Sequence, residues 1–224
     1  MRLSLVIPAY NEEKRISEVV RTYSKFLKPK LGYELIVVCD GNDRTADMAR
    51  KEGAKVLEFD HRLGKGGGVI AGFKEAKGDI IAFVDSDMSV GPGDFWRVYS
   101  AVGEYDVAIA SRRKKGSKTP IRQPFMRRFM SNTFNLTIRI IFGLRISDTQ
   151  CGAKAFKADS IRKVIPGMRS TGFEFDVELL WRLKRAGYSI TEVPVSWSHQ
   201  EGSTFSLSRG PGMLMRLIAR RLGA

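Results

Sequence analysis

Two carboxylates stand one residue apart directly after an apolar, strand-like run. Asp85 and Asp87 flank Ser86 and follow residues 80–84. Carboxylates so placed can reach one hard divalent cation, which prefers oxygen ligands and usually keeps water or substrate phosphate in its other positions. The spacing therefore indicates a Mg2+ or Mn2+ site for a diphosphate. For an isolated Asp-x-Asp, a turn that uses the aspartates for local hydrogen bonds is the commoner explanation.

Further polar residues follow a second predicted strand and a glycine-rich segment. Asp40 and Asp43 come after the apolar run 35–38, and Lys65 lies in the segment 63–68. Glycines let the backbone approach a phosphate, the start of a helix presents free N–H groups, and a lysine adds positive charge. The segment lacks the Walker spacing, and taken alone it is explained equally well as a flexible turn.

The hydrophobic pattern predicts an α/β fold with a mostly parallel central sheet flanked by helices. The predicted strands are 3–7, 35–38, 54–59, 79–84, 107–110, 153–156 and 190–197, and the predicted helices are 12–27, 45–52, 69–76, 125–142 and 175–186. Ligands of such sheets bind beyond the carboxyl ends of the strands. The polar groups after the first, second and fourth strands are therefore expected to meet in one crevice.

Charge is distributed unevenly along the chain. The 224 residues carry a net charge of +14, with 16 basic and 15 acidic residues in 1–100 but 22 basic and 9 acidic residues in 101–224. Such an excess predicts an anionic partner for the second half, and a nucleic acid, an anionic membrane or a phosphorylated substrate would each satisfy it. We expect one domain over residues 1–224, because no linker interrupts the chain.

Several classes of protein are disfavoured. Two cysteines cannot form a disulfide framework, which favours a reducing, cytosolic compartment. No zinc-finger, helix-turn-helix or RNA-binding aromatic motif is present, so we expect no nucleic acid partner despite the charge. No run of 18 apolar residues predicts a membrane span, and the N-terminal residues do not resemble a secretory signal.

Taken together, the motifs resemble a known enzyme family. The segments that carry the resemblance are 6–12, 38–43, 64–72, 85–87, 110–112, 148–152 and 172–180. They are similar to family 2 glycosyltransferases of the GT-A fold, in the branch that loads sugars onto dolichyl or polyprenyl phosphate. Residues 148–152 and 173–179 are more similar to the dolichyl-phosphate glucosyltransferases than to the mannosyl enzymes, so glucose is the expected sugar and GDP-mannose the alternative donor.

The resemblance implies a division of labour between residues 1–106, which would bind the nucleotide sugar, and residues 107–224, which would meet the acceptor and the membrane. The implied donor-binding residues are Pro8, Tyr10, Glu12, Val38, Asp40, Asp85, Ser86 and Asp87, to which we add Lys65 and Arg112. The implied metal ligands are Asp87, principally, with Asp85 and Ser89. In relatives an amide side chain often stands where this chain has Ser89. The first residue of the usual Asp-Asp pair after the second strand is here Cys39. A lysine usual in relatives is here Thr204, and Arg209 would be its substitute.

The implied reaction is one displacement at the anomeric carbon, with a lipid phosphate as nucleophile. That oxygen is already anionic near neutral pH, so the chemistry needs control of charge more than a general base. Arg112 and Arg127 are the predicted phosphate clamp, because guanidinium groups bind phosphate bidentately. Asp148 is predicted to orient the acceptor or a sugar hydroxyl. For an alcohol acceptor, Asp148 or Asp176 would be the base, although Asp176 also fits a helix-capping role.

Two segments interleave apolar and basic residues in the manner of helices on a membrane surface. They are 125–142 and 213–222, and packing against the sheet is the alternative for both. The resulting expectation is a peripheral enzyme on the cytoplasmic face of an anionic membrane, or one also free in the cytoplasm, that could use an integral-membrane partner. A basic nucleic-acid-binding protein and a non-catalytic nucleotide-sugar-binding scaffold are the alternatives of other classes.

Overall fold

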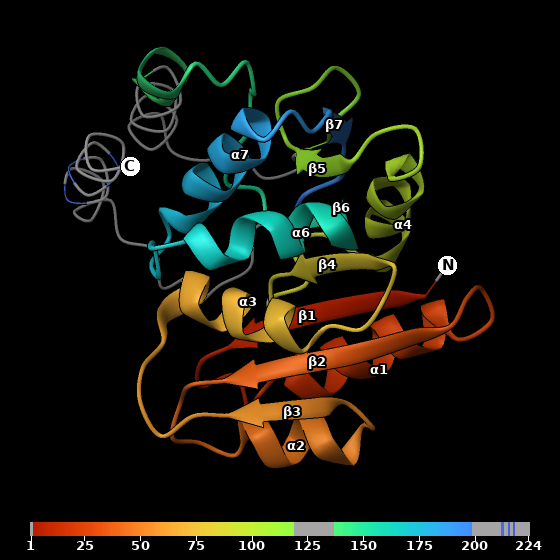
Figure 1. The fold of residues 1–224 in the computed structure, drawn as a ribbon. Coiled ribbons are helices and arrows are strands. Elements are labelled where there is room, and N and C mark those ends of the chain that lie inside the picture. The colour runs from red at the N-terminus through yellow and green to blue at the C-terminus, as the bar shows by residue number, and fades with distance from the viewer. Residues whose placement is uncertain (1, 119–136, 199–211, 213–214, 216, 218–224) are drawn as a thin grey trace.

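The chain folds around one seven-stranded sheet (Figure 1). The computed structural model describes residues 2–118 and 137–198 together with residues 212, 215 and 217. The strands are β1 Leu3–Ala9, β2 Tyr33–Cys39, β3 Lys55–Glu58, β4 Ile80–Val84, β5 Val107–Ser111, β6 Ala153–Lys157 and β7 Ile190–Pro194, in the order β3-β2-β1-β4-β6-β5-β7. Only β6 runs against its neighbours β4 and β5. The predicted mostly parallel sheet is confirmed.

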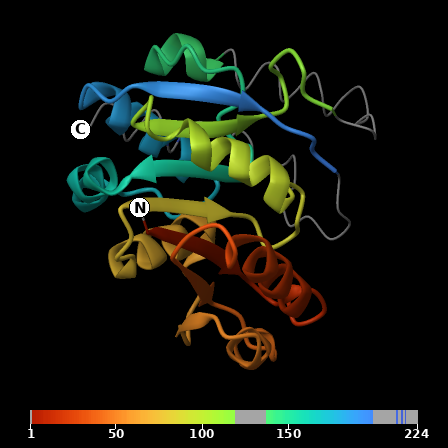
Figure 2. The ribbon, with the colours of Figure 1, turned by 90° about the vertical axis from the view of Figure 1, so that its right-hand side faces the viewer.

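Helices cover both faces of the sheet (Figures 1 and 2). The labelled helices within the described residues are α1 Ile16–Leu27, α2 Thr45–Lys51, α3 Gly64–Glu75, α4 Pro92–Ala101, α6 Ala158–Val164 and α7 Phe175–Arg185, and the 3-10 turn η1 Ile165–Gly167 follows α6. One core lies under α1, α2 and α4, and a second lies under α3, α6 and α7. Successive strand residues point to opposite faces, so Leu5 joins the first core and Val6 the second.

Two helices that the pattern analysis did not predict are α4 and α6. Helix α4 begins at Pro92 within a stretch of Gly, Ser and Pro residues, a composition that usually marks a loop, although proline is well tolerated in a first helical turn. Helix α6 is only 7 residues long, too short for its periodicity to stand out. The first helix also begins at Ile16 rather than at Glu12, and the last strand ends at Pro194 rather than at Trp197.

The two predicted membrane-surface segments lie largely outside the described residues. Residues 137–142 are helical, and Ile138 and Phe142 are buried in the core beside α7. For these two side chains the prediction of acyl-chain contact is wrong and core packing is correct. Ile140, in contrast, is 73% exposed. In the C-terminal segment, Leu217 is buried in the same core.

No helix within the described part of the chain has both the length and the apolar character needed to cross a bilayer.

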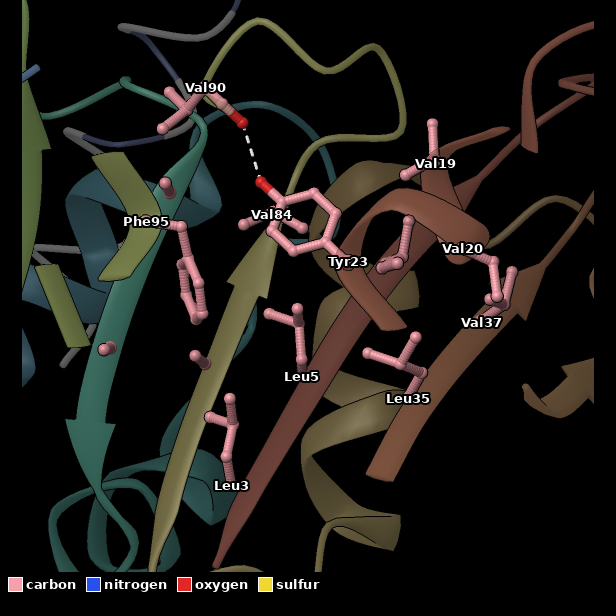
Figure 3. Close-up of a cluster of buried hydrophobic side chains, with 14 of the residues drawn as sticks. Leu3, Leu5, Val19, Val20, Tyr23, Leu35, Val37, Val84, Val90 and Phe95 are labelled. Carbon is pink, nitrogen blue, oxygen red and sulfur yellow. Dashed lines mark hydrogen bonds between the residues drawn. The ribbon is translucent and has the colours of Figure 1, made fainter. Parts of the chain in front are cut away.

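A buried tyrosine ties α1 to the loop that follows β4 (Figure 3). The Tyr23 hydroxyl donates to the carbonyl of Val90 at 2.7 Å, and its ring meets Phe95 of α4 edge-on. Burial raises the pKa of this hydroxyl, so it remains a donor. The bond fixes the loop that also carries Asp87 and Ser89.

We expect Tyr23→Phe to lower the free energy of unfolding by about 1 to 2 kcal/mol, because the Val90 carbonyl would stay buried without its donor. Urea denaturation measures the change. Tyr33→Phe is the matched control, since the Tyr33 hydroxyl makes only a 3.4 Å contact to Ser24 in a partly buried position. Equal losses from the two substitutions would contradict this role for Tyr23.

Candidate active site

The direction of β6 decides which loops share the carboxyl edge of the sheet. Strands β1, β2 and β4 run parallel and therefore end at the same edge. Because β6 is antiparallel to β4, its first residue pairs with the last of β4, as Ala153 does with Val84. The loop 148–152 before β6 is thus brought beside Asp85, and the end of β5, which precedes Arg112, lies at the same edge.

The loops after β1 and β4 are linked by side chains. Ser86 Oγ donates to Glu12 Oε1 at 3.1 Å, and Arg15 forms an ion pair with the Glu12 carboxylate. On the β2 side, the Glu12 backbone N–H donates to Thr45 Oγ1 at 2.7 Å. The structure therefore brings the predicted residues Glu12 and Ser86 together, and it adds Arg15, which the pattern analysis did not single out.

Lys65, at the start of α3, forms an ion pair with Asp85. The Lys65 Nζ lies 2.6 Å from Asp85 Oδ1. Burial raises the pKa of the Asp85 carboxyl, and Lys65 offsets this only in part. Burial alone would lower the pKa of Lys65, but the carboxylates of Asp85, Asp176 and Asp87 outweigh it and raise that pKa. Lys65 therefore keeps its positive charge beside these carboxylates.

The backbone of Gly152 lies directly against Asp85. The Asp85 N–H donates to the Gly152 carbonyl at 2.9 Å, and a Cβ built on Gly152 would overlap the Asp85 carboxylate. A side chain larger than hydrogen fits at position 152 only if the Asp85 carboxylate turns away or one of the two loops moves. The loop 148–152 and the Asp85 carboxylate therefore constrain each other's positions.

Asp87 is oriented by the next turn of the chain. Its Oδ1 accepts hydrogen bonds from the Ser89 N–H at 2.9 Å and the Ser89 hydroxyl at 2.6 Å, and Met88 between them adopts a left-handed conformation with φ 58°. Oδ2 accepts no hydrogen bond from any residue that the structure describes. Ser89 thus supports the carboxylate of Asp87, whereas the pattern analysis had placed it among the metal ligands themselves.

The donor set at this edge fits a magnesium or manganese ion that is shared with a ligand. Within the described residues, no three His, Cys, Asp or Glu side chains gather into a complete metal cluster. Sites of this kind bind Mg2+ through one or two carboxylates and take the remaining oxygens from water and substrate phosphates. Asp87, with its second oxygen uncommitted, meets that requirement better than Asp85, which already contacts Lys65.

Asp40 caps the turn that leads into α3. Its Oδ2 accepts hydrogen bonds from the backbone N–H groups of Leu63 and Gly64, both at 2.9 Å. Arg62 lies over the ring of Tyr10, with its guanidinium carbon 3.0 Å from the ring centroid. Pro8 and Val38 are paired in adjacent strands and face Gly68 of α3.

Four of the predicted donor-side residues therefore lie in one corner of the carboxyl edge, namely Pro8, Tyr10, Val38 and Asp40. Cys39, beside them, cannot replace an acidic residue, because burial raises the pKa of its thiol to about 12.

Arg112 is held by a buried carboxylate. Its Nε and Nη2 donate to the two oxygens of Asp148, both at 2.7 Å, and its backbone N–H donates to Oδ2 at 3.0 Å. Burial alone would raise the pKa of Asp148, but Arg112 outweighs it and the pKa is lowered. Asp148 has no exposed surface, whereas the Arg112 side chain is 23% exposed. Asp148 therefore orients Arg112 and has no direct access to a ligand.

The remaining predicted residues are placed as follows. Arg127, Thr204 and Arg209 lie outside the described residues. Asp176, the first-turn residue of α7, is buried in an ion pair with Lys154 of β6. Lys154 was missed by the pattern analysis, although a lysine that shares a strand face with Phe156 signals a charge pointed into a core.

The glycosyl transferase family 2 profile matches residues 4–165, which include the ends of β1, β2, β4 and β5 and the loop before β6. The chain belongs to this family. The resemblance recognised in the motifs is thereby confirmed.

Individual proteins are similar to this chain over most of its length. A dolichyl-phosphate beta-glucosyltransferase from Saccharomyces cerevisiae is 33% identical over 92% of this family 2 chain and 70% of its own length. One from Drosophila melanogaster is 30% identical over 100% and 77%. An undecaprenyl-phosphate mannosyltransferase from Micrococcus luteus is 32% identical over 94% and 89%.

The fold of this family 2 member matches solved GT-A glycosyltransferases. Glucosyl-3-phosphoglycerate synthase from Mycobacterium tuberculosis, in complex with Mn2+, UDP-glucose and phosphoglyceric acid, superposes with a TM-score of 0.74 over 99% of this chain and 79% of its own, at 21% identity. The same enzyme with Mg2+ and UDP gives a TM-score of 0.73. The likeness confirms the predicted fold.

Gly152→Ala is expected to reduce the free energy of unfolding by about 1 to 3 kcal/mol, since the new methyl group would displace Asp85 or the loop that carries it. Urea denaturation followed by circular dichroism gives the value. Gly93→Ala in α4 is the matched control, because nothing lies within 4 Å of a Cβ there and alanine favours a helix. A Gly152→Ala protein as stable as the parent would show that the close approach is not required.

Proposed function

We propose that this protein transfers a hexose from a nucleotide diphosphate sugar to the phosphate of a polyprenyl lipid, with inversion at the anomeric carbon. The observation that carries the proposal is the contact of the loop 148–152 with both halves of the site. Gly152 packs on Asp85, while Asp148 in the same loop holds Arg112. A carboxylate edge suited to a metal diphosphate thus adjoins a guanidinium suited to a second phosphate.

The donor would lie across the ends of β1, β2 and β4. Tyr10 and Asp40 would flank the base, with Pro8 and Val38 beneath it, and Asp85 would lie near the ribose. Glu12 and Ser86, hydrogen-bonded to each other, would keep these loops at a fixed separation. Lys65 would stay paired with Asp85 and supply positive charge near the phosphates.

A divalent ion would be held principally by Asp87, with Asp85 nearby, and Ser89 would keep the Asp87 carboxylate in place. Once bound, Mg2+ or Mn2+ supplies the positive charge that stabilises the departing diphosphate. This choice of metals is supported by the Mn2+ and Mg2+ complexes of structural neighbours with the same fold.

The acceptor side favours a nucleophile that arrives already ionised. Asp148 and Asp176, the two base candidates for an alcohol acceptor, are both buried in ion pairs with Arg112 and Lys154. A carboxylate so engaged is a poor acceptor for a substrate proton, whereas a phosphate monoester needs no deprotonation by the protein. Arg112 Nη1, which no described residue hydrogen-bonds, is the group that would bind the acceptor phosphate. Arg127 remains a second candidate.

Glucose from UDP-glucose is the proposed sugar, because two of the relatives described above are glucosyltransferases of dolichyl phosphate. The Micrococcus luteus relative makes mannose from GDP-mannose the second candidate. The basic second half would lie against an anionic membrane that holds the lipid, as a peripheral protein of the cytoplasmic face, alone or with an integral-membrane partner. The cytoplasm itself is a further location.

The proposal is tested by a panel of nucleotide sugars supplied with polyprenyl phosphate and Mg2+ or Mn2+, with labelled sugar counted in the lipid extract. UDP-glucose is expected to give the most product. Asp87→Asn should reduce it about 100-fold or more, because the ligand charge is lost, while Asp94→Asn in α4 should leave it unchanged. Failure of every donor would contradict an enzyme of this class, and salt-sensitive binding of DNA or RNA in its place would support the nucleic-acid alternative.

Arg112→Lys keeps the charge but removes the guanidinium fork. We expect kcat/KM for polyprenyl phosphate to fall about 10-fold while the Kd for UDP-glucose changes by less than about twofold. Titration calorimetry and initial rates separate the two quantities. The control is Lys115→Met, which removes a charge from the exposed part of the same loop and should alter neither. Equal losses in acceptor use and donor binding would place Arg112 on the donor side instead.

A further inference from the structure

Lys154 is a lysine that is fully buried within the central sheet. It lies in β6 opposite Phe83 of β4, its side chain has no exposed surface, and its Nζ is 5.1 Å from the centre of the Phe83 ring. Removing an ammonium group from water costs several kcal/mol unless it is paired and hydrogen-bonded. Lys154 meets that condition through the ion pair with Asp176 and a 2.9 Å hydrogen bond to the carbonyl of Cys151.

The Cys151 carbonyl belongs to the turn that touches Asp85. The next residue is Gly152, whose carbonyl accepts the Asp85 N–H and whose Cα leaves no room beside the Asp85 carboxylate. Lys154 therefore holds this turn from the side of the core while Asp85 contacts its other side. Movement of the turn would change the position of Asp85, since the Asp85 N–H is bonded to Gly152 and the carboxylate lies close beside the same residue.

The charges of this region form two pairs side by side. Lys65 pairs with Asp85, and Lys154 pairs with Asp176. Without Lys154, the Asp176 carboxylate would be uncompensated in the interior, and Lys65 is an ammonium group on which the charge of Asp176 already acts. Attraction of Lys65 toward Asp176 would then weaken its contact with Asp85.

We propose that the Lys154–Asp176 pair is a positioning device for the donor site, which keeps Asp85 and Lys65 in register with the diphosphate without touching the substrate itself. The inference rests on the proposed function, because it assigns the pair to binding of a nucleotide sugar. A purely structural pair that only joins β6 to α7 is the alternative.

The test removes both charges at once. In Lys154→Met/Asp176→Val, apolar side chains replace the pair at nearly the same total volume, and such replacements of buried ion pairs are often neutral for stability. Lys154→Met alone should be strongly destabilised, because it leaves Asp176 buried and unpaired. The double variant should regain most of the free energy of unfolding yet show a KM for UDP-glucose and a Kd for UDP with Mn2+ raised about 10-fold or more, with a smaller change in kcat.

Lys157→Met provides the matched control, because Lys157 is in the same strand and pairs with Asp106 at 2.8 Å in a partly exposed position. It should leave KM and Kd unchanged. A double variant that is stable and binds UDP with parental affinity would overturn the inference while the proposed function stands. A parent protein that neither binds UDP with Mn2+ nor transfers sugar would overturn both. If the double variant does not fold, Asp176→Asn, which keeps the shape and a hydrogen-bond acceptor for Lys154, must show the raised KM for the inference to hold.

Discussion

The contact between Asp85 and the loop 148–152 is the constraint on which the rest of the site depends. It joins the end of β4 to the start of β6, two segments more than sixty residues apart, and it leaves space only for glycine at position 152. Asp85 is held on another side by Lys65 of α3. The Asp85 carboxylate is 25% exposed, and a backbone contact and an ion pair limit its freedom to reorient, which suits the proposed site for a metal diphosphate.

The same loop organises the acceptor side. Asp148 gives both of its oxygens to Arg112, and Glu192 of β7 in turn accepts hydrogen bonds from the backbone N–H groups of Ser147 and Asp148, both at 3.1 Å. Arg112 is therefore oriented by the more deeply buried Asp148, whose backbone N–H is in turn bound by Glu192. In the proposed site this arrangement would keep Asp148 away from the anionic reactants while presenting Arg112 toward them.

Several acidic residues of the strongly basic second half lie inside the protein. Of the nine acidic residues in this half, Asp148, Asp176, Glu178 and Glu192 are buried or nearly so, and each contacts a basic side chain. These four carboxylates are thus engaged inside the protein and reduce the positive charge of its surface little. A positively charged surface attracts anions, which agrees with the proposed lipid phosphate acceptor.

The motifs at strand ends were sufficient to predict the fold and the family and to place most of the proposed donor-side residues at one edge of the sheet, because a strand followed by a polar loop has a local signature in composition and periodicity. Asp85, Asp87, Asp40 and Lys65 were identified in this way. The alternation of buried and exposed residues is the same in a parallel and an antiparallel strand, so the sequence did not reveal that β6 runs against its neighbours. The pairs Arg112–Asp148 and Lys154–Asp176 depend on that direction. Chemistry carried by a short segment is thus determined by the sequence itself, whereas the partner of each buried charge is decided only when distant segments pack together, since charge compensation acts through space.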